Sequence, residues 1–176
     1  MENKSSQKYY IAGGIVLIII IIAAVMLLGG SKSSKSLVGT WTSSVSGKGL
    51  EGAGTITTAH TVTKLTATGD VNLVIQEVEN GVAIGTITYS NLCLTAAVSV
   101  SGRAAVTEPA KCVNVDSKSV QAQITGNAIT FGGTTVLGGT VLFTGTYSND
   151  TISGTFKQTS SYGEVDGTFS LMRTKN

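Results

Sequence analysis

Two patterns of apolar residues divide this chain. Ile11 to Leu28 form an unbroken run without a charged side chain, IAGGIVLIIIIIAAVMLL. As a helix this run would span roughly 27 Å, close to the hydrocarbon thickness of a bilayer. From Leu37 to Arg173, short stretches of alternating apolar and polar residues are separated by glycine-rich turns. Such alternation predicts antiparallel β-strands with one buried face.

We therefore expect four regions: a short N-terminal tail (1–10), a transmembrane signal-anchor helix (11–28), a flexible tether (29–36) and an extracytoplasmic β-domain (37–176). The apolar run is longer than the core of a typical cleaved signal peptide, and the sequence after it is a poor cleavage site. Retention of the segment is favoured over cleavage. The lipid bilayer is then a partner through residues 11–28.

Turn chemistry sets the register of the predicted strands. A two-residue turn at Asn149-Asp150 pairs Phe143 with Phe156 and leaves both on the apolar face. A turn at Gly126-Asn127 pairs Ile124 with Ile129 in the same way. Alternation and turn position agree at both hairpins, so we expect both registers to be correct.

The stretch Glu79–Gly81 allows two readings. A two-residue Asn80-Gly81 turn would mix apolar and polar residues on each face. A three-residue loop with Gly81 in the left-handed conformation instead gives a register in which Leu73 lies opposite Ile87. We therefore predict the longer loop.

Successive hairpins with one apolar face each predict an all-β fold. An antiparallel up-and-down barrel of about 8–10 strands covers those faces, with a β-sandwich as the alternative. The side chains expected inside, as filler or as the wall of a ligand cavity, are Ile87, Tyr89, Phe143, Tyr147, Phe156 and Phe169. A filled interior is favoured over a hollow one, as in other small barrels.

Charge and cysteine content narrow the functional classes. Charged residues make up 12% of the chain and the net charge is +2, which argues against a nucleic-acid partner.

The two cysteines, Cys93 and Cys112, predict one disulfide in an oxidising compartment, with two buried thiols as the alternative. Because Pro109 interrupts a regular ladder, we expect a loop from about Ser101 to Pro109 whose base the disulfide clamps. The disulfide, together with a glycosylation triplet at Asn149, places the domain outside the cytoplasm.

The chain offers little for catalysis. His60 is the only histidine, so neither a histidine-rich zinc site nor an ordinary serine-histidine-aspartate triad is expected. The acidic residues fall mostly beside predicted turns. We predict no catalytic residues, no metal ligands and no cofactor.

The two ends of the β-domain carry a recognisable pattern. Gly39-x-Trp41 opens the first predicted strand, and Arg173 ends the last. This pattern resembles the calycin superfamily, which includes the lipocalin, fatty-acid-binding and avidin barrels. The resemblance implies that Trp41 packs near the closed end of a barrel with Arg173 across its indole. It also implies ligand binding in general, but biotin binding does not carry over because Trp41 is the only tryptophan.

Three functions follow, in order of preference. The first is a membrane-anchored, non-catalytic binding module, with a lipid or another hydrophobic small molecule as its ligand. The second is a structural surface subunit, since archaeal-type pilins also combine an N-terminal hydrophobic helix with a Thr/Gly-rich β-domain. An enzyme is third. The sequence names no protein partner.

Overall fold

The β-domain is described by a computed structural model over residues 37–100, 103, 105–134, 139–160 and 163–174. The predicted tail, anchor helix and tether lie outside these residues. The described residues all belong to one compact unit. Within the described part of the chain, no helix has the length and apolar character needed to cross a membrane.

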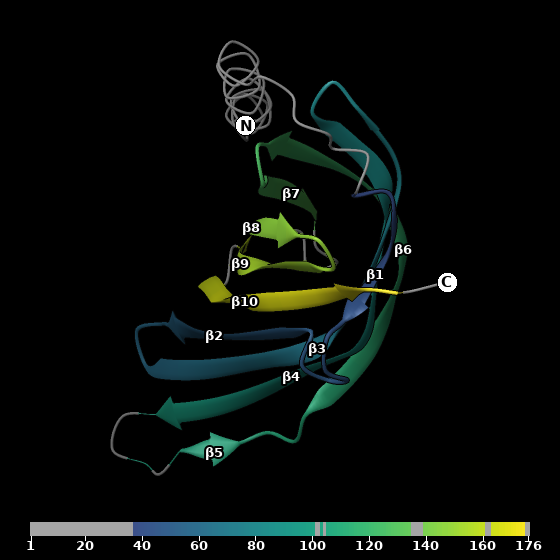
Figure 1. Cartoon of the computed structure of the whole chain (residues 1–176). Helices are drawn as coiled ribbons and strands as arrows, with labels where there is room; N and C mark the ends of the chain where they lie inside the picture. Colours follow the sequence, from purple (N-terminus) through teal and green to yellow (C-terminus); the bar gives the residue numbers. More distant parts are fainter. Residues whose placement is uncertain (1–36, 101–102, 104, 135–138, 161–162, 175–176) are drawn as a thin grey trace, which may run out of the picture. The chain divides into compact units, whose positions relative to one another are not determined.

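The described residues form one antiparallel sheet of ten strands (Figure 1). The strands are β1 (Gly39–Ser43), β2 (Leu50–Thr57), β3 (Thr61–Glu79), β4 (Val82–Val100), β5 (Val106–Thr107), β6 (Lys111–Thr125), β7 (Ala128–Thr134), β8 (Thr140–Ser148), β9 (Thr151–Ser160) and β10 (Gly163–Arg173). The prediction of an all-β antiparallel fold is confirmed. All ten strands share one sheet, whereas the alternative sandwich requires two.

The sheet closes into a ring because its pairings return to their start. From β6 to β10 each strand pairs with the next one in the sequence, and β3 pairs with β4. The short strands β1 and β2 both lie between β3 and β10, one after the other. Two short strands at the start of the domain thus join the last strand to the rest of the sheet.

The two-residue turns have the predicted registers. Phe143 lies opposite Phe156 across the turn at Asn149-Asp150. Ile124 lies opposite Ile129 across the turn at Gly126-Asn127. Both pairs are buried or nearly so, as expected when alternation and turn position agree.

The β3–β4 hairpin has the predicted register but not the predicted loop. Leu73 does face Ile87. Glu79, however, pairs with Val82, so the turn consists of Asn80 and Gly81 alone, both with positive φ. A register shift between Ile75 and Glu77 restores the apolar face. The expectation of a three-residue loop was therefore wrong, because a bulge within the strand absorbed the extra residue.

The segment before Cys112 is also more regular than predicted. Val106 and Thr107 form β5, which pairs with Val98 and Ala97 of β4. The ladder resumes on β6 at Lys111 after a gap around Pro109. Proline interrupts the pairing without converting the whole of 101–109 into a loop, so this expectation is corrected.

The core lies on the inward face of the ring. Its largest fully buried side chains are Trp41, Phe143, Leu37, Leu73, Ile129, Ile152 and Leu171. None of the described polar or charged side chains is buried. The core is therefore held together by apolar packing, which is the main source of stability in such a domain.

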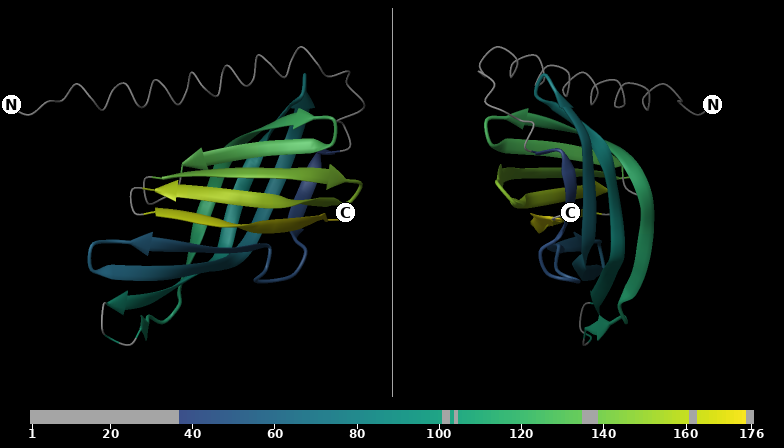
Figure 2. Two further views of the ribbon diagram at one scale, coloured as in Figure 1. Left: turned by 90° about the vertical axis from the view of Figure 1, so that its left-hand side faces the viewer. Right: turned by 45° about the vertical axis from the view of Figure 1, so that its right-hand side comes forward.

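The ring is uneven around its circumference. β6 pairs with β4 from Lys111 to Gln123, but with β7 only from Ala122 to Thr125. Among the described residues, the other edge of β6 has no strand partner before Ala122. Both views of Figure 2 show β4 and β5 reaching beyond the β7–β10 hairpins. One end of the sheet is consequently open on its inward face.

Candidate functional site

The first candidate feature is the contact between the two ends of the domain. Trp41 is fully buried, and its indole Nε1 donates a hydrogen bond to the Leu37 carbonyl at 2.9 Å. The Arg173 guanidinium carbon lies 4.2 Å from the centre of the Trp41 ring. Arg173 Nη1 donates a hydrogen bond to the Val38 carbonyl at 2.9 Å. The predicted contact between Trp41 and Arg173 is therefore present.

Gly39 fits this arrangement for a conformational reason. Its backbone φ is +140°, a value that residues other than glycine rarely adopt. A Cβ at this position would also lie 2.9 Å from Arg173 Nη1. The cluster of Gly39, Trp41 and Arg173 joins the first and last strands of the ring.

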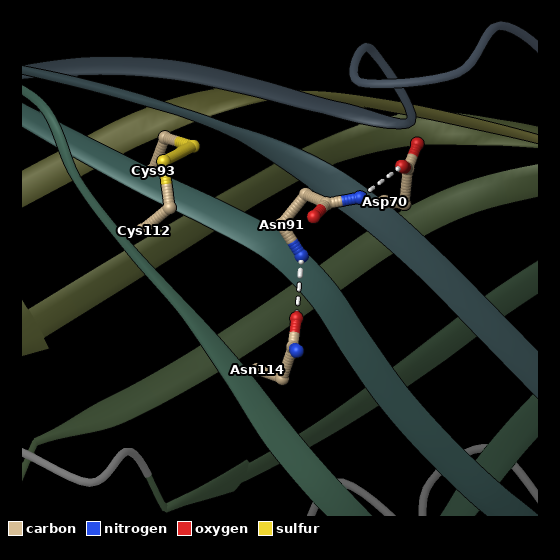
Figure 3. Close-up of a disulfide and its surroundings, with 5 residues drawn as sticks. All are labelled: Asp70, Asn91, Cys93, Cys112 and Asn114. Atoms are coloured by element: carbon tan, nitrogen blue, oxygen red, sulfur yellow. Dashed lines mark hydrogen bonds between the residues drawn. A yellow bond between two sulfur atoms is a disulfide. The ribbon is translucent and has the colours of Figure 1, made fainter.

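The second feature is the disulfide between Cys93 and Cys112, which the sequence predicted. The two residues are directly opposite on β4 and β6, with Cα atoms 3.9 Å apart. Figure 3 shows the bridge close to Asn91. The Asn91 side chain donates to Asp70 on β3 at 3.4 Å, and its backbone N–H donates to the Asn114 side chain on β6 at 2.9 Å. These contacts cross-link three strands at the open end of the sheet.

The aromatic side chains predicted to lie inside the ring do gather there. Phe143 lies at the centre of the group, with ring centres 5.3 Å from Phe169 and 5.7 Å from Phe156. Phe131, which was not among the predicted interior residues, stacks on Phe143 at 4.7 Å. The rings pack against one another in the interior at this level.

Two glycines make this packing possible. A Cβ at Gly145 would come within 2.9 Å of the Phe169 ring, and Gly167 lies beneath Phe156 in the same way. The aromatic rings therefore lie directly over backbone. The alternation of glycine with aromatic residues on β8 to β10 is a packing pattern rather than a binding motif.

The remaining predicted interior residues are divided between core and rim. Ile87 is buried in the core. Tyr147 is only partly buried, and its hydroxyl donates to the Gly126 carbonyl at 2.8 Å. This hydrogen bond ties β8 to the β6–β7 turn, so Tyr147 supports the ring where β6 and β7 are joined.

The open end of the sheet carries apolar side chains on its inward face, most of them exposed and two of them, Leu92 and Val98, partly buried. We call this surface the open face and define it by Leu92, Leu94, Val98, Val100, Val106 and Val113. Leu92, which contacts the core, lies opposite Val113, and Val98 lies opposite Val106. Val113 is nevertheless 52% exposed, and Val106 is 63% exposed. Sequence reasoning missed this surface because alternation identifies an inward face without showing whether anything covers it.

Three polar side chains share the inward face of β4 and β6. Lys111 lies opposite Leu94, Lys118 lies opposite the buried Ile87, and Tyr89 lies opposite Val115. Both lysines are exposed, whereas Tyr89 is partly buried with its ring 6.4 Å from Phe143. Burial raises the pKa of the Tyr89 phenol well above its usual range, so the hydroxyl keeps its proton, and its capacity to donate a hydrogen bond, even at high pH. Within the described residues its hydroxyl has no hydrogen-bond partner.

Comparison of the chain with protein-family models, curated proteins and solved structures gave no match.

The described residues include no cluster of side chains that could bind a metal ion. No three His, Cys, Asp or Glu side chains among them lie close enough together to hold one. His60 is exposed, and Lys157 and Glu164 form a half-exposed ion pair at 2.7 Å. Asn149 is exposed at the tip of the β8–β9 hairpin.

The open face, with Tyr89 and the two lysines, is the described surface best suited to a ligand.

Proposed function

We propose that this protein is a non-catalytic binding module for a hydrophobic small molecule, held at the extracytoplasmic face of a cytoplasmic membrane. In this proposal the closed ring is an up-and-down barrel. The observation that carries the proposal is the open face. Contiguous exposed apolar surface on a folded domain is typical of a site that a ligand or partner covers.

The sequence and the disulfide support the proposed location. The apolar run 11–28 would remain as a signal anchor, and the Cys93–Cys112 bridge suits an oxidising compartment. Asn149 would then be available for glycosylation at an exposed hairpin tip. Intact mass of the membrane-extracted protein should include Met1 or Glu2. A mature chain that starts near Ser31 and is recovered in the soluble fraction would contradict the anchor.

Photocrosslinking can test ligand binding in the full-length protein. Membranes that contain the protein are exposed to a neutral long-chain alcohol that carries a photoreactive group, and labelled peptides are located by mass spectrometry. We expect labelling on β4 and β6 in addition to labelling of residues 11–28. Labelling confined to residues 11–28 would contradict the proposal.

A matched pair of variants sharpens this test. Val113→Asp places a charge on the open face, whereas Val62→Asp places one on the outward face of β3, where Val62 is 38% exposed. We expect Val113→Asp to remove most of the β4 and β6 labelling and Val62→Asp to preserve it. Equal labelling in both variants would show that the probe does not bind the open face.

A second function, a structural subunit of a surface filament, is favoured by one observation. The edge of β6 before Ala122 is unpaired within the described residues, and such an edge can accept a strand from another chain. Mechanical shearing of cells distinguishes the two functions. A filament subunit would be released as a polymer, whereas a monomeric anchored domain would need detergent.

A further inference from the structure

The inward-facing pairs of β4 and β6 carry positive charge but no negative charge. Six such pairs run from Leu94–Lys111 to Ala83–Ala122, and their only polar members are Tyr89, Lys111 and Lys118. None of them carries a carboxylate. The nearest acid on β6, Asp116, lies in the irregular stretch between Val115 and Lys118. Hydrogen-bond donors and positive charge therefore accompany apolar surface without a neutralising partner in these pairs.

Tyr89 and Lys118 are the two donors closest to the packed core. Tyr89 lies opposite Val115, and Lys118 lies opposite Ile87, two residues before Tyr89. Diagonal neighbours of this kind are within reach of long side chains. A hydroxyl and an ammonium can together bind the two oxygens of one anionic headgroup.

The apolar side chains extend from these donors in one direction. Leu92 and Val113 come next along the sheet, followed by Leu94 and then Val98. A hydrocarbon chain with its headgroup at Tyr89 and Lys118 would lie along this row. The packed phenylalanines close off the other direction, since Phe143 already contacts Tyr89.

We infer that the open face binds a single-chain amphiphile with an anionic oxygen headgroup, held by Tyr89 and Lys118, and with its tail over Leu92, Val113 and Leu94. This inference rests on the proposed function and adds the class of ligand. It also predicts discrimination, because a neutral amphiphile of the same length would gain the apolar contacts but not the charge-assisted hydrogen bonds.

The test compares two photoreactive probes with the same alkyl chain, one an alcohol and one a carboxylate. The full-length protein in membranes is labelled with each probe at a pH above the pKa of the carboxylate headgroup. We expect the carboxylate to label β4 and β6 at a roughly three- to tenfold lower concentration than the alcohol. Equal labelling would overturn the anionic preference but leave the proposed function intact. No labelling of β4 or β6 by either probe would contradict the proposed function itself.

Three variants test the assignment of the headgroup site. Tyr89→Phe removes the hydroxyl and keeps the ring that packs on Phe143, and Lys118→Gln removes an exposed charge. We expect each to reduce the preference for the carboxylate without changing labelling by the alcohol. Lys64→Gln is the matched control, since Lys64 is an exposed lysine on the outward face of β3. If Tyr89→Phe and Lys118→Gln both label like the unmodified protein, the headgroup lies elsewhere and the inference is wrong.

Discussion

The ring around Trp41 and Phe143 differs sharply from the open face of β4 to β6, although both follow the same alternation of apolar and polar residues. In the first region the phenylalanine rings pack against one another, and Trp41 is fully buried. In the second, Val106 and Val113 point inward but remain more than half exposed. Alternation therefore establishes which face of a strand is inward. Whether that face contributes to stability depends on whether side chains from other strands of the ring pack against it.

The largest expected effect comes from removing side chains in the closed region. Trp41→Ala and Phe143→Ala should each lower the free energy of unfolding by roughly 3–5 kcal/mol, because both leave cavities in packed surroundings. Val113→Ala, made for comparison, should cost less than about 1 kcal/mol. Chemical denaturation monitored by circular dichroism measures all three. A cost for Val113→Ala equal to that of Phe143→Ala would mean that the open face is covered in the isolated protein.

The disulfide should matter next, because it stabilises the region that packing stabilises least. The double variant Cys93→Ser/Cys112→Ser should lose about 3 kcal/mol in the chain-entropy model, given the 19-residue separation. Thiol labelling of the denatured, unreduced protein should find no free cysteine. Reduction should destabilise the unmodified protein and leave the double variant unchanged. Full labelling without reduction would rule out the bridge.

Tyr89 lies at the boundary between the two regions and should give a pH-dependent signature. Its pKa is raised by burial, so the folded state holds its proton more tightly than the unfolded state. Stability from this group is fully present below the unfolded pKa of about 10 and is lost as pH rises above it, by roughly 1.4 kcal/mol per pH unit. The Tyr89→Phe variant should lose less stability than the unmodified protein between about pH 10 and 11. Identical losses would place the phenol in solvent.

The smallest effect is expected at the exposed side of the ring closure. Arg173→Ala should cost about 1 kcal/mol through the lost contact with the indole and the lost packing of its aliphatic stem. Trp41 is the only tryptophan, so its fluorescence should shift to longer wavelength in this variant. Arg173→Lys, which keeps the charge, should recover part of the loss. An unchanged emission spectrum would mean that the arginine does not shield the ring.

Sequence reasoning predicted the local features well. The hairpin registers at Asn149-Asp150 and Gly126-Asn127 follow from turn chemistry and alternation, both of which act within a few residues. The disulfide could also be anticipated from residue type and position, and the Trp41–Arg173 contact from the resemblance of the two chain ends to the calycin pattern. The β3–β4 turn could not, because a bulge near Gln76 changes the count of residues without changing the faces.

The open face shows a different limit of sequence reasoning. Val113 and Leu94 alternate with polar residues as regularly as Phe143 does, and nothing in their own segments distinguishes them. Their exposure depends on the separation of β6 from β7 before Ala122, where the two strands are not paired. This separation is a property of the whole ring. The inward positions of Val115, Val113 and Lys111 also depend on the register shift between Lys118 and Val115. Such features need long-range pairings that periodicity does not encode.

The closure of the ring by the first and last strands has a consequence for biosynthesis. Arg173 donates a hydrogen bond to Val38, 135 positions away in the sequence, and β10 also supplies the partner edge for β1 and β2. Until the ribosome has released the final strand, those two short strands can pair only with β3. Contacts between such distant segments slow folding and leave nascent edges unpaired for longer. The emerging domain therefore keeps the edges of β1 and β2 unpaired until its C-terminal residues are available.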